Sequence, residues 1–152
     1  MEKKRRLILI IIGLAWPIVG LGFMAFHFGY LPSGLSLIAE AIGLFIAGVL
    51  SGLLYLGVRN VFKTKLGAGL IDAGYVLFAP ISIMTALIAP GLGEEMGSQL
   101  TFVLISPIMI ILYSMAAMAA GLGMTSSLAI VAQILADRSK PPKEAITEVK
   151  DK

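Results

Sequence analysis

Few residues of this sequence could do chemistry, and the most informative of them is Glu40. It is the single charged residue in an apolar stretch that runs from Leu35 to Val58. An ionisable side chain inside a membrane span is energetically costly, so its presence indicates a functional site. At 1.5 Å per residue, Glu40 would lie about 7–8 Å inside the start of this stretch. It could bind a proton or a cation, or it could reach the lipid headgroups or hydrogen-bond a neighbouring helix.

Four other residues carry titratable side chains that could contribute to a site. His27 is the one histidine, at the far end of the first apolar stretch, and with Glu40 it forms our candidate ion or proton site. Glu94 and Glu95 lie in a loop on the same side, but the spacing matches no metal signature such as H-E-x-x-H, so we expect no metal site. Asp72 is expected in the first turn of a helix that begins near residue 70, where the helix dipole favours a carboxylate.

Most enzyme mechanisms need residues that this sequence lacks. It has no cysteine, which excludes disulfides, thiolate metal sites and cysteine nucleophiles. The sequence has neither a glycine-rich loop that would bind phosphate nor a G-x-S-x-G motif that would present a serine nucleophile. A single histidine does not favour axial haem ligation. We therefore expect no enzymatic activity and no cofactor. The basic residues flank apolar stretches, which is typical of contacts with anionic lipids and not with nucleic acid.

The composition is that of an integral membrane protein. The 152 residues are 58% apolar and 14% charged, with a mean hydropathy of +0.95, whereas soluble domains have about 25% charged residues. Four stretches are long enough to cross a hydrocarbon core of about 30 Å: about 7–28, 35–58, 70–89 and 100–121. Short connections make consecutive helices antiparallel. The sequence predicts an all-α, four-helix transmembrane up-down bundle in one domain, 1–136, followed by a charged tail, 137–152.

The stretch after the fourth span is short for a fifth crossing and contains several polar residues. Met124, Leu128, Val131 and Leu135 would share one face of a helix, which is a modest amphipathic signal. We expect residues 124–136 to form either a helix in the membrane interface or a continuation of the fourth helix.

Small residues are the strongest structural signal. They form a helix-packing strip in the second span, at Gly43, Ala47, Gly48, Ser51 and Gly52. Such strips let helix backbones approach closely in lipid. We expect helix kinks at Pro17, Pro80 and Pro107. Trp16 is expected to pack against another helix, with its indole N–H bound to a carbonyl that Pro17 leaves free.

These features favour a non-catalytic subunit, or an assembly or stabilising partner, of a larger membrane complex. The partners would be membrane lipids and either other membrane subunits or further copies of the chain. The alternative is a small oligomeric transporter or channel in which Glu40 couples to protons or cations. A basic N-terminus before the first span suits a prokaryotic plasma membrane.

The distribution of basic residues predicts the orientation of the chain. All twelve Lys and Arg lie before the first span, between the second and third, or after the fourth, and cytoplasmic segments hold this excess. Both termini should therefore be cytoplasmic. A reporter that is active only in the cytoplasm should be active when fused after Lys152 and inactive when inserted at Gly91. Inactivity after Lys152 would contradict this orientation.

Overall fold

The computed structural model describes residues 2–29, 34–88 and 99–139, and within them the chain is helical without strands. The helices are α1 (Glu2–Phe28), α2 (Leu35–Val61), α3 (Lys65–Ile88) and α4 (Gln99–Arg138). Each is long and apolar enough to cross a membrane. The predicted all-α bundle of four spans is confirmed. Most of the predicted charged tail, together with Glu94 and Glu95, lies outside the described residues.

The start of α3 differs from the prediction. Thr64 caps this helix, because its Oγ1 accepts a hydrogen bond of 3.2 Å from the Gly67 amide, as a threonine does at a helix N-cap. The helix therefore begins at Lys65 and has no acidic residue in its first turn. The expectation that Asp72 lies in the first turn is wrong, because apolar content alone does not reveal the turn that Thr64 adds.

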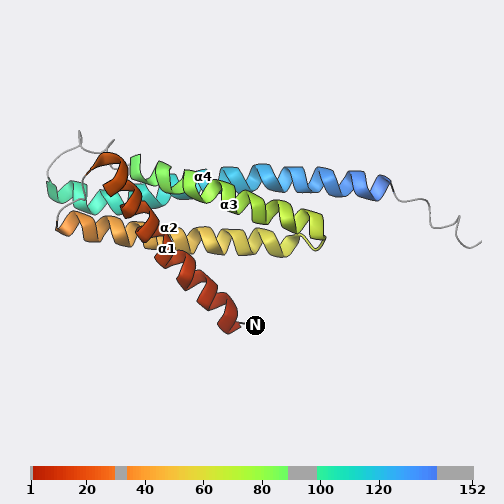
Figure 1. Ribbon diagram of the computed structural model, residues 1–152, viewed down its shortest axis with the longest axis horizontal. Helices are drawn as coiled ribbons and strands as arrows, with labels where there is room; N and C mark the ends of the chain where they lie inside the picture. Colours follow the sequence, from red (N-terminus) through yellow and green to blue (C-terminus); the bar gives the residue numbers. More distant parts are fainter. Residues whose placement is uncertain (1, 30–33, 89–98, 140–152) are drawn as a thin grey trace, which may run out of the picture.

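Helix α4 is continuous over 40 residues, about 60 Å at 1.5 Å per residue. Of the two forms expected for residues 124–136, the structure has the continuation of the fourth helix. Pro107 lies inside this uninterrupted helix, as Pro17 and Pro80 do in α1 and α3. Figure 1 shows the last part of α4 running past the connection between α2 and α3.

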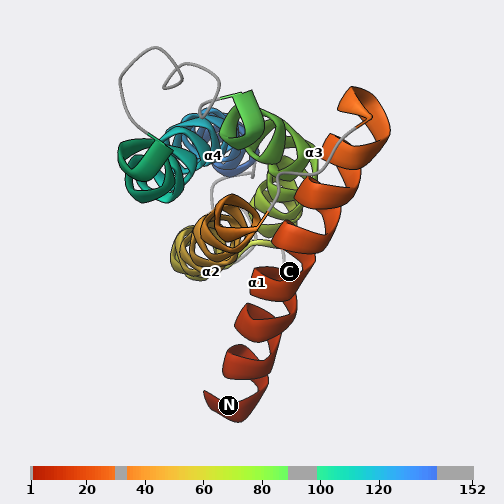
Figure 2. The same cartoon turned by 90° about the vertical axis from the view of Figure 1, so that its left-hand side faces the viewer.

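Helices α2 and α3 each contact the other three helices. Helix α2 runs parallel to α4 and antiparallel to α3 (Figure 1). Helix α1 crosses α2 obliquely, so that its N-terminal half leads away from the other helices in both views (Figures 1 and 2). Within the described ranges, α1 contacts α2 and α3 but not α4. We call the end of the bundle that holds Arg5, Arg59 and Lys65 the basic end.

The predicted packing strip of α2 is buried at all five positions. Its glycines face two different helices. A Cβ added to Gly48 would lie 2.7 Å from Trp16 Cγ in α1, and one added to Gly43 would lie 2.9 Å from Pro107 Cα in α4. Glycine is required at these points because any side chain would collide with the neighbouring helix.

A leucine at Gly48 should therefore destabilise the bundle. The added side chain would push Trp16 away, and overpacking of this kind costs about 1–3 kcal/mol. Thermal unfolding in detergent would measure the loss. Gly57 is the matched control, because a Cβ added there meets nothing within 4 Å, so Gly57→Leu should be tolerated. Equal stability of Gly48→Leu and the native chain would show that the contact with α1 is dispensable.

Candidate functional site

Glu40 is buried in the structure, with 4% of its surface exposed. Ser36, one turn earlier on α2, donates a hydrogen bond of 3.0 Å to Glu40 Oε1. The second carboxyl oxygen, Oε2, is buried and has no hydrogen-bond partner among the described residues. Among the described residues, no Lys or Arg forms an ion pair with Glu40, and Arg59 of the same helix pairs with Asp72. A buried carboxyl in this condition must be protonated or must bind a cation.

Buried serine hydroxyls continue the polar interior from Glu40 into the bundle. Ser82 on α3 and Ser106 and Ser114 on α4 are buried, and their oxygens have no partner within the described ranges. The Ser51 hydroxyl on α2 donates a hydrogen bond of 3.6 Å to the Met115 sulfur. The more exposed hydroxyls of α3 and α4 instead donate to a carbonyl about one turn earlier in their own helix: Thr85, Thr125, Ser126 and Ser127. The oxygens of Ser82, Ser106 and Ser114 therefore have hydrogen-bonding capacity that no described residue uses.

The packing of α2 on α4 brings Glu40 and Ser106 to the same level. Gly43 faces Pro107, and α2 and α4 are parallel, so Glu40 is level with the turn that precedes Pro107. Ser106 lies in that turn. Pro107 has no amide hydrogen, so the carbonyl of Val103, four residues earlier, lacks its usual helical donor. Three oxygen-bearing groups without a full set of partners thus lie at one level of α2 and α4.

His27, the other member of the candidate site, is exposed and belongs to an aromatic cluster. Its ring stacks on Phe23 with centroids 3.6 Å apart and meets Phe26 edge-on at 5.2 Å. Its Nδ1 lies 3.2 Å from the Phe23 carbonyl oxygen. No described hydrogen bond or ion pair joins it to Glu40. Among the described residues, no three His, Asp or Glu side chains gather as metal ligands would.

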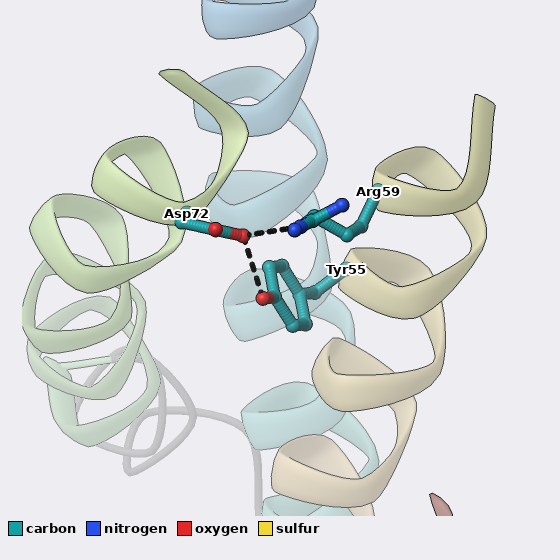
Figure 3. Close-up of polar contacts among 3 residues, drawn as sticks. All are labelled: Tyr55, Arg59 and Asp72. Carbon is teal, nitrogen blue, oxygen red and sulfur yellow. Dashed lines mark hydrogen bonds and ion pairs between the residues drawn. The ribbon is translucent and has the colours of Figure 1, made fainter. Parts of the chain in front are cut away.

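A second polar group lies nearer the basic end and joins α2 to α3. Asp72 Oδ1 accepts a hydrogen bond of 2.7 Å from the Tyr55 hydroxyl and one of 2.8 Å from Arg59 Nε (Figure 3). The Arg59 and Asp72 side chains are 38% and 44% exposed. The sequence analysis missed Tyr55, although its spacing of four residues from Arg59 on one helix is a usable signal.

An aromatic chain extends this group to α1. The Tyr55 and Tyr75 rings are 4.6 Å apart between centroids, and Tyr75 packs against the buried core that includes Trp16 of α1. The expectation that Trp16 packs against another helix is met by its contact with Gly48. Its expected hydrogen bond to a carbonyl near Pro17 stays a prediction.

Comparison with known proteins adds no assignment, since no protein-family model, curated protein or solved structure matches the chain. The arrangement itself contains no paired nucleophile and base in the described residues. It offers a buried carboxyl at the level where α2 meets α4, and a hydrogen-bonded connection between α2 and α3.

The Tyr55–Asp72 hydrogen bond should contribute measurably to stability. Tyr55→Phe keeps the ring beside Tyr75 and removes only the hydroxyl, so the free energy of unfolding should fall by about 0.5–1.5 kcal/mol. Arg59→Gln should cost less, about 0–1 kcal/mol, because that ion pair is partly exposed. Denaturation of both variants with and without Asp72→Asn gives the coupling energies. Zero coupling between Tyr55 and Asp72 would contradict this assignment.

Proposed function

We propose that this protein is a non-catalytic subunit, or an assembly or stabilising partner, of a larger membrane complex. The observation that supports this proposal is an uncovered face of α4 with the spacing that a partner helix requires. This face combines three features: its position relative to the charged residues of α2 and α3, the spacing of its exposed residues, and the side chains that these residues carry.

The C-terminal part of α4 extends beyond the level of Arg59 on α2 and Asp72 on α3. Close approaches of Gly74 to Thr125 and of Gly121 to Phe78 set the pairing of α3 with α4. Continued along these antiparallel helices, this pairing puts Asp72 level with Ser127. Charged side chains such as Asp72 and Arg59 are disfavoured in hydrocarbon. The residues of α4 after Ser127 therefore lie at or beyond the lipid headgroups.

Exposed positions on α4 follow the alternating spacing of three and four residues that is typical of a coiled-coil seam. They form what we call the α4 seam: Tyr113, Ala116, Ala120, Gly123, Ser127, Ile130 and Ile134. Ile130 and Ile134 are 51% and 49% exposed, at and beyond the level of the headgroups. Four more exposed apolar residues flank them: Met124, Leu128, Val131 and Leu135. Contiguous apolar surface outside lipid is characteristic of a protein interaction site.

The membrane half of the α4 seam supports the same proposal. Ala116, Ala120 and Gly123 are small and exposed, and a Cβ added to Gly123 would meet nothing within 4 Å. Small residues on a lipid-facing surface let a second helix approach closely. A partner helix that follows α4 would cover small residues inside the membrane and isoleucines outside it. A transmembrane subunit whose helix continues past the bilayer has this form.

A second candidate function, a small transporter or channel, is favoured by a different observation. Glu40 is buried with an unpartnered oxygen, and buried serines continue inward from it on α2, α3 and α4. In this candidate Glu40 would be the residue that couples to protons or cations, in an oligomer.

A single cysteine can test the accessory-subunit proposal, because the native chain has none. In native membranes, Ser127→Cys labelled with a maleimide that carries a short photoreactive diazirine should cross-link on illumination to a different protein. Ala136→Cys is the matched control, since Ala136 is also exposed and lies about 200° round the helix from Ile134. It should give little product.

Ala120→Leu in the Ser127→Cys background should abolish this adduct while leaving thermal stability unchanged, because Ala120 is exposed on the surface of α4. Two results would contradict the proposal. One is the absence of any adduct, and the other is an adduct formed only between copies of this chain.

A further inference from the structure

We infer that Glu40, Ser106 and the backbone carbonyl of Val103 form a binding site for one sodium ion between α2 and α4. The site includes the residue on which the second candidate function rests, but binding does not require transport. It is also separate from the α4 seam, so it holds whether or not the protein is an accessory subunit.

The charge of the site favours a monovalent cation. The Glu40 carboxyl is 4% exposed, its Oε1 accepts one hydrogen bond from Ser36, and its Oε2 has no partner in the described residues. An ionised carboxylate in a low-dielectric interior is stable only when it is paired. One sodium ion neutralises one carboxylate, whereas a divalent ion would leave a net positive charge buried in the membrane. The single carboxylate therefore selects against calcium and magnesium.

The neighbouring groups supply oxygen ligands. The Ser106 hydroxyl is 3% exposed and has no partner within the described ranges. The Val103 carbonyl lacks its helical donor because residue 107 is proline. Carboxylate, hydroxyl and carbonyl oxygens suit hard cations. Carbonyls released from irregular helices coordinate sodium ions in membrane transporters.

The packing of the two helices makes a shared site possible. A Cβ added to Gly43 would lie 2.9 Å from Pro107 Cα and 3.2 Å from the Pro107 oxygen, so no side chain separates α2 from α4 there. Glu40 and Val103 both lie within about one turn of this contact, toward the end of the bundle opposite the basic end. At 1.5 Å per residue, Glu40 is about 7–8 Å from the start of α2 at Leu35. The carboxyl is therefore buried close to that end of α2.

The experiment measures sodium binding to the purified full chain in nanodiscs, by equilibrium binding of ²²Na⁺ and by thermal unfolding in sodium chloride against choline chloride. We expect one sodium ion per chain and a higher Tm in sodium, because a ligand that binds only the folded state stabilises it. Glu40→Gln should abolish both effects. Ser106→Ala should weaken binding by about tenfold, as expected for a lost interaction with a charged group.

Ser114→Ala is the matched control, because Ser114 is also a buried serine of α4 without a described partner, about two turns away. It should bind sodium as the native chain does, and the Ser106–Ser114 comparison remains decisive even if Glu40→Gln fails to fold. The inference is overturned if the native chain binds no sodium ion and has the same Tm in sodium chloride as in choline chloride. A protonated Glu40 would give this result. The inference is also overturned if both serine variants lose binding equally.

Uptake of ²²Na⁺ into proteoliposomes separates the site from the transport candidate. Binding without uptake would support the site and remove that candidate function. If the native chain binds and takes up ²²Na⁺ and Glu40→Gln abolishes the uptake, the result would support both the sodium site and the transport candidate. The cross-linking of the α4 seam is unaffected by either result.

Discussion

Close approach of helix backbones at small residues is the contact on which the rest of this bundle depends. Lipid is as apolar as leucine, so membrane helices are held together by packing contacts and not by hydrophobic exclusion from water. In α2, Gly48 admits Trp16 of α1, and Gly43 admits Pro107 of α4. Gly74 and Gly121 do the same between α3 and α4. Around these approaches, the buried apolar side chains of the core, such as Leu44, Ile71 and Ile110, pack between the helices.

The same packing determines where polar groups can be buried. Glu40 lies on the face of α2 that carries the glycines, so the helix contact that Gly43 permits also removes the carboxyl from lipid. Ser51 shares this face and contacts Met115 of α4. By contrast, the Tyr55, Arg59 and Asp72 group lies where side chains remain partly exposed, and its members satisfy one another. Polar groups near the basic end are therefore paired, whereas those deeper in the bundle keep free hydrogen-bonding capacity.

The number and type of helices could be predicted from the sequence because twenty consecutive apolar residues have few alternatives to a membrane-spanning helix. The burial of the α2 strip follows from its small residues in the same way. Helix ends were harder, since the start of α3 depends on a single threonine cap and shifts Asp72 out of the first turn. The contacts between helices could not be predicted from the sequence. The partner of Trp16, the burial of Ser106 and the convergence of Tyr55 on Asp72 depend on the rotation and register of one helix against another, which composition does not encode.

Because α2 uses opposite ends of one strip for two neighbours, the bundle has an order of assembly during synthesis. A chain made from its N-terminus completes α1 and α2 first, so Trp16 can settle against Gly48 while the later helices are still being made. Pro107 belongs to α4 and reaches Gly43 only when that helix has inserted. Until then the carboxyl of Glu40 lacks the cover that α4 gives it. The last helix to arrive is therefore the one that closes the carboxyl into the interior.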